Sequence, residues 1–591
     1  MTMDPVTLAV VRGSLEQIAD EMDLHLIHAA ISPIISETND CANGIFHPTT
    51  GETIAQGRYG LPVFLAYMQF SVQHIIGLAN AQGGFKEGDI WIMNDTYLGG
   101  SHLQDVQLVA PIFVAGELFA VLATTGHWMD IGGNVPGGWG PKATEIHQEG
   151  IVIPPVKLYE QGRLNEALLA MFKANVRLPM EIAGDLSAMV NVFSVGHRGV
   201  EALVQRYSAP VLSDCLNEMI AYSERQMRSY ITEIPDGTYR CEDFLDNDGI
   251  VDQAVPVKLA ITVKGDEMHF DFTGTGPSTT GPMNMSRNTT LSSCYVAIKH
   301  IFPDVPVNGG TFRPISFTLP PRTLLSAEYP TACGGYLEPM GRAIDVTFGA
   351  LAQAIPDKAP AAFFGTIGVT AISGTHPRTG NFYVGVFPYP GGYGASKASD
   401  GLINGTPPQS MANFMSLEMS EHRFPIRFNS YSVRDDSGGA GWHRGGCGTS
   451  YSFSTWSECL VTVLGDRADH APFGVLGGGP ALANVVEFVT DGQTWTPQMR
   501  SKEDKRALHA GDTLRANSPG GGGYGNPLER ELDAVERDLN AAYISRATAE
   551  QVYGVVVASE SQPFAGTPVF ALDRAASEQR RKQLMTQTAA A

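Results

Sequence analysis

The spacing of apolar residues over the first thirty positions predicts a helix. Asp4 and Pro5 are a typical N-cap and first helical residue, and apolar side chains then recur every three or four positions from Val11 to Leu26. Pro33 marks the end of this pattern. The chain should therefore begin with an amphipathic helix of about six turns.

The next segment alternates apolar and polar residues over a shorter period, which predicts strands. Residues 36–57 alternate short apolar runs with NG, HP and TG turns, which is typical of a turn-rich β unit. A second helix is expected over 64–81 and a strand over 89–95, DIWIMND. The runs VQLVAPIFV (106–114) and LFAVLATT (118–125) flank the short turn AGE, so together they predict a β-hairpin.

The pattern of apolar and polar residues changes several more times along the chain. Residues 163–232 carry amphipathic helical runs, short alternating strands begin near residue 236, and glycine strings appear after residue 390. A helical pair is expected over 528–560, and the last 15 or so residues look frayed. We therefore predict a large multi-domain α+β protein with four parts: a mixed α/β domain at 1–234, a second mixed α/β domain at 235–390, a glycine-rich β region at 391–527, and a tail of short helices at 528–591.

Composition narrows the class of protein. The chain is 43% apolar and 17% charged, no stretch has the 18 apolar residues that a membrane helix needs, and the start lacks a basic, signal-like segment. Seven cysteines without a C-x-x-C motif indicate neither a disulfide framework nor a thiolate zinc site. The net charge is -21, with no basic run to follow a phosphate backbone. We expect a soluble cytoplasmic protein that binds neither nucleic acid nor membrane.

The predicted hairpin lies between two H-x-x-D pairs. His102 and Asp105 precede its first strand, and His127 and Asp130 follow its second, so the two pairs can meet at one edge of a sheet. Two imidazoles and a carboxylate suit Zn, Mn or Fe and leave coordination positions open, although histidines beside glycines are often only turn residues. Asp130 is a further ligand, a carboxylate that orients His127, or a structural residue of the GHWMDIGG turn.

Other candidate groups carry weaker signals. Asp40, in SETNDCANG, offers another carboxylate or is simply an Asx-turn residue. His147 and Glu149 are possible acid–base groups. The glycine strings match neither a Walker-A loop nor a dinucleotide fingerprint, and a G-x-S-x-G elbow is absent from the sequence. The sequence therefore contains no recognisable nucleotide site or serine-hydrolase motif.

Six further segments lie in order along nearly the whole chain. They are DPVTLAVVRGSLE, MNDTYLGGSHLQDV, GHWMDIGG, EGIVIPPVKLY, RDDSGGAGWHRGGCG and SPGGGGYGNP. Together they resemble the signatures of the hydantoinase B/oxoprolinase family. This family includes the B subunits of ATP-dependent N-methylhydantoinases, 5-oxoprolinases and caprolactamases, and the alpha subunits of acetone carboxylases. Thr96 stands where the family pattern NDPYxGGxHxxD usually has proline.

The resemblance implies a metal site and a partner. The family's ligands fall on His102, Asp105 and His127, with a further carboxylate at Asp40; the first three are also the expected catalytic groups, and Zn or Mn the expected metal. The resemblance further implies a separate hydantoinase A-type subunit that binds ATP and Mg, in a hetero-oligomer such as α2β2. That partner would phosphorylate the amide oxygen of a hydantoin, 5-oxoproline or lactam ring, and this chain would add water.

Two other functions remain open at the level of sequence. One is the alpha-type subunit of an ATP-dependent, biotin-independent ketone carboxylase, in which the same metal site would hold an enolate or phosphoenol-type intermediate. The other is a non-catalytic scaffold with a structural metal, which is disfavoured because His/Asp sets without cysteine more often form open sites.

Overall fold

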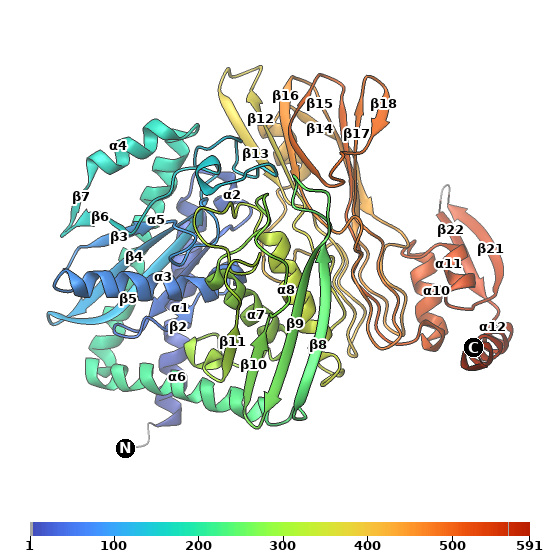
Figure 1. The fold of residues 1–591 in the computed structure, drawn as a ribbon, viewed down its shortest axis with the longest axis horizontal. Helices are drawn as coiled ribbons and strands as arrows, with labels where there is room; N and C mark the ends of the chain where they lie inside the picture. The colour runs from blue at the N-terminus through green and yellow to red at the C-terminus, as the bar shows by residue number, and fades with distance from the viewer. Residues whose placement is uncertain (1–3, 565–566, 591) are drawn as a thin grey trace.

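The computed structural model describes residues 4–564 and 567–590 (Figure 1). Its first element is helix α1 (Pro5–Ala29), with the Asp4 side chain accepting a hydrogen bond from the backbone N–H of Thr7, as the N-cap signal predicts. The predicted apolar face of α1 is buried, mainly against α5 (Pro179–Tyr207). The α+β class predicted from the sequence is confirmed, because helices and several separate sheets share the chain.

A seven-stranded antiparallel sheet forms the frame of the N-terminal region (Figure 1). Its long central strands are the predicted hairpin, and the predicted β unit and strand pair on either side of it. Strand β1 is buried along its whole length, because α1 and α3 (Pro62–Ala81) pack against it. In spatial order the strands are β2 (Thr53–Gln56), β1 (Cys41–Phe46), β5 (Glu117–His127), β4 (Asp105–Val114), β3 (Ile90–Met93), β6 (Val156–Glu160) and β7 (Arg163–Leu164).

Helix α3 is long and strongly apolar. Among the described residues it is the one helix whose length and composition would suffice to cross a membrane. Most of the relevant window is buried inside the protein, where α3 packs against α7 (Arg287–Ile301) and the seven-stranded sheet. Its hydropathy is thus accounted for by its position between two layers of the fold.

The helical region ends in a second, four-stranded sheet. After α4 (Glu166–Asn175), α5 and α6 (Ala209–Ile231), the strands run in the order β11, β10, β9, β8, and α7 and α8 (Leu337–Leu351) lie on this side of the molecule. One hydrophobic core contains buried residues from Val11 in α1 to Leu464 and so spans the boundary expected near residue 234. That boundary stays a prediction. The strands are β8 (Gly237–Leu245), β9 (Val255–Lys264), β10 (Glu267–Asp271) and β11 (Ile315–Thr318).

Two further sheets form the β-rich part of the chain. They have the orders β13-β12-β16-β19 and β14-β15-β20-β17-β18, and they enclose a core of their own. Helix α9 (Leu417–Arg423) precedes β14. The strands are β12 (Val369–Thr375), β13 (Phe382–Phe387), β14 (Ile426–Val433), β15 (Thr449–Thr455), β16 (Cys459–Leu464), β17 (Val485–Thr490), β18 (Gln493–Trp495), β19 (Lys502–Leu508) and β20 (Thr513–Asn517).

The glycine strings form a bundle of extended segments packed backbone to backbone. The Gly446 N–H donates to Tyr393 O, and the Gly521 N–H donates to Gly446 O, so three distant segments are linked in succession. A Cβ on Gly446 would lie 1.9 Å from Leu402 O. These glycines therefore let segments of the chain approach one another more closely than residues with a Cβ could.

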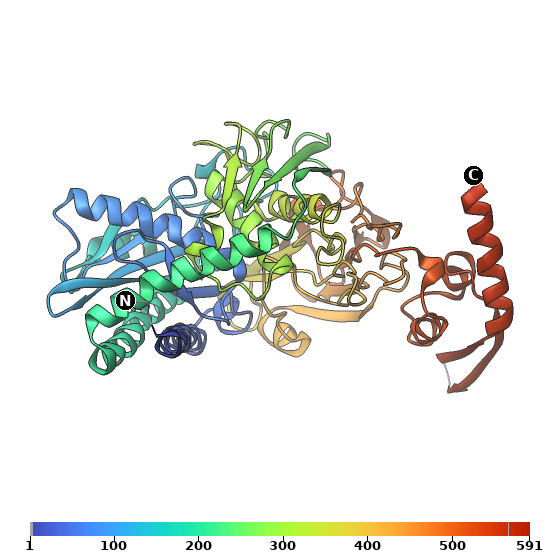
Figure 2. The ribbon, with the colours of Figure 1, turned by 90° about the horizontal axis from the view of Figure 1, so that it is seen from below.

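The C-terminal region differs in part from the sequence prediction. The expected helical pair is present as α10 (Leu532–Asn540) and α11 (Arg546–Gln551). The expectation of a frayed end is wrong, because a hairpin of β21 (Val557–Phe564) and β22 (Thr567–Leu572) leads into helix α12 (Arg574–Ala590). Arg581 anchors α12 by donating to the carbonyls of Tyr553 and Arg530, contacts that local composition does not reveal. Figure 2 shows this region at one end of the molecule.

The glycine bundle generates a stability prediction. Replacing Gly446 with Ala should lower the free energy of unfolding by about 3 kcal/mol or more, because the new methyl group overlaps a backbone carbonyl that cannot move freely. Thermal melting of the purified chain measures the effect. The matched control is Gly13→Ala, where the added Cβ meets nothing within 4 Å on the exposed face of α1 and should be neutral or stabilising. Equal melting temperatures for the two variants would contradict the packing argument.

Candidate metal centre

Asp105 and His127 face each other across the β4–β5 hairpin. They are register partners at its open end, and His127 Nδ1 lies 3.1 Å from Asp105 Oδ1. His102 precedes β4 by one turn of chain, and its Nε2 lies 3.0 Å from the same oxygen. All three side chains are almost completely buried. The structure thus brings together the two histidines and the carboxylate that the sequence singled out.

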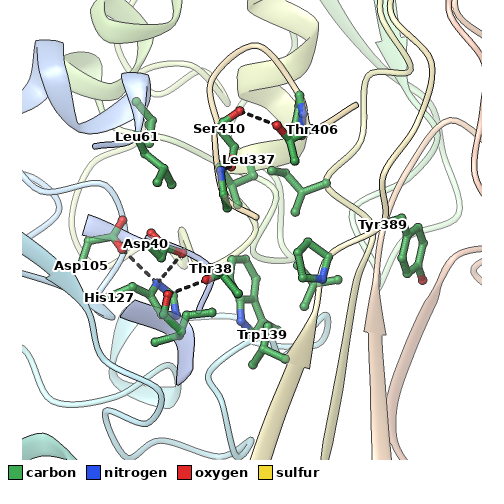
Figure 3. A pocket seen from close by; sticks show the side chains of 18 of the residues that line it. Thr38, Asp40, Leu61, Asp105, His127, Trp139, Leu337, Tyr389, Thr406 and Ser410 are labelled. Atoms are coloured by element: carbon green, nitrogen blue, oxygen red, sulfur yellow. Dashed lines mark hydrogen bonds and ion pairs between the residues drawn. The ribbon is translucent and has the colours of Figure 1, made fainter. Parts of the chain in front are cut away.

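Asp40 reaches this group through the pairing of β1 with β5. Cys41 is the register partner of Gly126, so the neighbouring Asp40 lies beside His127, whose N–H donates to Asp40 O at 3.1 Å. The Asp40 carboxylate points toward the same histidine, with Oδ2 3.9 Å from His127 Nδ1 (Figure 3). Its Oδ1 is buried and has no hydrogen-bond partner among the described residues.

The spacing of these atoms suits ligands of one divalent ion. Two ligands about 2.1 Å from an ion lie about 3.0 to 3.4 Å apart in octahedral or tetrahedral geometry, close to the observed separations around Asp105. The unpaired Asp40 Oδ1 supplies a further oxygen. Within the described part of the chain, His102, Asp105 and His127 are the one group of three or more such side chains close enough to hold a metal ion. The donor set therefore fits a Zn²⁺ or Mn²⁺ site.

The two carboxyl groups differ in their environment. Burial tends to raise the pKa of Asp105, but the charges and hydrogen bonds of His102 and His127 outweigh it and lower that pKa. Burial raises the pKa of Asp40 to about 7, and the charge of Asp105 adds to the rise while His127 opposes it. Asp105 Oδ2 also accepts hydrogen bonds from Ser101 Oγ and from Tyr336 OH at 3.3 Å. Asp105 is consequently held as a fixed carboxylate.

Two aromatic residues that the sequence motifs did not single out complete this end of the site. The Trp139 ring stacks on His127 with centroids 5.9 Å apart, and the Tyr336 ring lies 4.9 Å from that of His102. Trp139 Nε1 is buried and has no acceptor in the described part of the structure. Trp139 follows the glycines of VPGGWG, and Tyr336 follows those of CGGY. Glycine-rich turns ending in an aromatic residue are the signal that could have drawn attention to both.

The four side chains lie at one end of a cavity with largely apolar walls. Figure 3 shows Asp105, Asp40 and His127 on one side of it and Tyr389 on the other. The walls come from segments far apart in sequence, including α3, the start of α8, β12, β13 and the chain between β13 and α9. Apolar residues that line it include Val63, Phe64, Leu337, Val369, Val386 and Phe414.

Asp130 does not belong to this group. Its carboxylate pairs with Arg177 at 2.8 Å and also accepts the backbone N–H groups of Arg177 and Gly132. Asp130 therefore joins the GHWMDIGG turn to the segment before α5. These contacts agree with a structural role for Asp130, and not with a role as a ligand or as a group that orients His127.

His147 and Glu149 are also separate from the cavity. His147 Nε2 lies 2.8 Å from Tyr329 OH near the surface, whereas Glu149 is buried and accepts the backbone N–H groups of Cys333 and Gly334. Burial raises the pKa of Glu149 to about 8, and those two hydrogen bonds oppose the rise. Glu149 thus anchors the turn that leads to Tyr336, and the pair does not form an acid–base couple.

Comparison with known proteins agrees with this architecture. The model of the family described as hydantoinase B/oxoprolinase matches residues 4–527. The chain belongs to this family. The resemblance seen in the sequence motifs is thereby confirmed, and Thr96 does not disturb the hydantoinase B/oxoprolinase site, because the turn that carries it still brings His102 within 3.0 Å of Asp105.

Full-length relatives are found within the hydantoinase B/oxoprolinase family. The caprolactamase beta subunit of Pseudomonas jessenii is 32% identical over 95% of this chain and 97% of its own length. A putative D-/L-hydantoinase B subunit of Pseudomonas sp. (strain NS671) is 30% identical over 95% of this chain and 96% of its own length. The crystal structure of the ATP-dependent caprolactamase from Pseudomonas jessenii superposes with a TM-score of 0.88 at 30% identity, covering 98% of this chain and 100% of that one.

The geometry predicts which residues control metal content. His102→Ala and His127→Ala should each weaken divalent-metal affinity by about a hundredfold or more, because each removes one of the two imidazole nitrogens that converge on Asp105 Oδ1. Metal content per chain after dialysis, measured by mass spectrometry, checks this. Asp130→Asn is the matched control from the second H-x-x-D pair and should keep its metal. Metal retained by both histidine variants, or lost from Asp130→Asn, would contradict the assignment.

Proposed function

We propose that this chain is the metal-dependent subunit of an ATP-dependent cyclic amide hydrolase. The observation that carries the proposal is the convergence of His102, Asp105, His127 and Asp40 at one end of a cavity with apolar walls. Membership of the hydantoinase B/oxoprolinase family and the caprolactamase and hydantoinase names of full-length relatives support the substrate class. The substrate is a hydantoin, 5-oxoproline or lactam ring.

ATP chemistry is assigned to a separate subunit. The sequence has no Walker-A or dinucleotide motif, and relatives of full length are named as B or beta subunits. We infer that a hydantoinase A-type partner binds ATP and Mg and phosphorylates the amide oxygen of the ring. An amide resists attack by water because the attack destroys the amide resonance. Phosphorylation of the amide oxygen weakens that resonance and makes the carbon easier to attack. A cytoplasmic hetero-oligomer such as α2β2 is part of this proposal.

The residues of this chain then prepare the addition of water. The ion held by His102, Asp105, His127 and Asp40 supplies Lewis acidity when bound. Ser101 and Tyr336 hold Asp105 in place, and Trp139 packs on the His127 ring. The apolar walls keep bulk water from a reactive phosphorylated ring, which would otherwise hydrolyse before the correct attack.

Turnover by the assembled complex tests the proposal. The chain, purified with its ATP-binding partner, should consume ATP in the presence of a cyclic amide and release the ring-opened acid. His127→Ala should lower turnover by about a thousandfold or more, since metal stabilisation of developing charge contributes several kcal/mol. Asp130→Asn is the control and should retain turnover, because its side chain contacts Arg177 and not the cavity. ATP consumption only with a ketone and bicarbonate would instead identify a ketone carboxylase.

A further inference from the structure

The cavity beside the candidate metal centre has charged groups at one end only. Asp40, Asp105, His102 and His127 lie at that end, and no lysine or arginine lines the cavity among the residues that the structure describes. We propose that it selects cyclic amides whose ring bears no charged substituent, and excludes rings that carry a carboxylate. This inference rests on the proposed function and narrows its substrate class.

A carboxylate on the ring would have to face the apolar walls of the cavity. In the proposed reaction the amide oxygen and its phosphate group would lie at the end formed by Asp40, Asp105, His102 and His127, so the remaining ring atoms and their substituents would face apolar side chains such as Val63 and Val386. A carboxylate taken from water into an apolar site without a partner is strongly destabilised. A ring that carries one should therefore bind much more weakly than a neutral ring of the same size.

The positive charges behind the cavity wall are already paired. Ile367 lines the cavity, and its N–H donates to Glu338 of α8. Behind this wall the buried Arg342 lies 3.6 Å from Asp243 and 3.8 Å from Asp466. Buried carboxylates thus hold this guanidinium in the layer behind the wall, away from any ligand in the cavity.

The neutral polar groups of the cavity match the amide part of such a ring. Trp139 Nε1 is a buried donor that lacks an acceptor in the described part of the chain, and an amide oxygen is a suitable acceptor. Thr38 Oγ1 and Thr406 Oγ1 already donate to backbone carbonyls. The remaining ring atoms would contact aliphatic walls such as Val386. In a ring of methylene groups closed by one amide, the amide oxygen can accept from Trp139 Nε1 and the methylene groups can contact the apolar walls.

Matched pairs of rings test the proposal on the unmodified complex with its ATP-binding partner. 2-Pyrrolidinone and 5-oxoproline differ only by a carboxylate, 5-oxoprolinamide is neutral and of similar size, and 2-piperidone and its 6-carboxylate repeat the comparison in a larger ring. The neutral member should have a kcat/KM at least about a hundredfold higher, as expected for burying an unpaired charge. Calorimetric titration without ATP should show the same order of binding.

The outcomes separate this inference from the proposed function. Equal or better turnover and binding of the carboxylated rings would overturn the inference and leave cyclic amide hydrolysis intact. Absence of ATP-dependent ring opening with every lactam, hydantoin and carboxylated ring would overturn both. Preference for 5-oxoprolinamide over 5-oxoproline shows that charge, and not bulk, is rejected.

A substitution in the apolar wall provides a second test. Val386→Lys places a cation in the cavity, and Val386→Met adds comparable length without charge. The ratio of kcat/KM for 5-oxoproline to that for 2-pyrrolidinone should rise at least about tenfold in the lysine variant relative to the methionine variant. An unchanged ratio in a lysine variant that melts normally would contradict the proposal. If the lysine variant does not fold, the ring pairs on the unmodified complex decide.

Discussion

The pairing of Asp105 with His127 across the β4–β5 hairpin is the contact on which the site depends. Side chains alternate between the two faces of a strand, so a shift of one residue in this pairing would point one of them away from the other. The register is held by ten paired residues of β4 and by the pairing of β1 with the other edge of β5. The same β1 pairing sets Asp40 beside His127, so one sheet register places three of the four candidate ligands.

Closure of the cavity is a second constraint, and buried polar contacts between distant segments maintain it. Tyr336 touches Asp105, and the turn that carries it is anchored by Glu149. Glu338, two residues further on in α8, is tied to the Ile367 wall. Buried carboxylates and arginines need partners to stay charged. Here they link α8 to the neighbouring segments and so hold the part of the cavity wall that contains Ile367.

The glycine bundle shows how composition can mislead about function. Runs such as PGGGGYG are as rich in glycine as phosphate-binding loops but lack their motifs, and this segment contacts other backbone of the same chain. Gly521 lies so close to Tyr393 that a Cβ would come within 2.0 Å of backbone atoms. Omitting side chains lets hydrogen-bonded backbones pack in more than one direction. The glycine segments therefore pack on one another, and Arg444 beside them pairs with Asp538 of the C-terminal region.

Local sequence patterns were sufficient to predict the main elements and the centre of the candidate site. Apolar periodicity predicts α1 and the β4–β5 hairpin, because burial of one face requires that spacing. The H-x-x-D spacing marks His102, Asp105, His127 and Asp130 alike, and the family resemblance then points to the first three and to Asp40. The remainder required the folded chain, since contacts between distant segments leave no local pattern. Folding packs Trp139 on His127 and pairs Asp130 with Arg177. It also orders helix α12, whose anchors lie elsewhere in the chain.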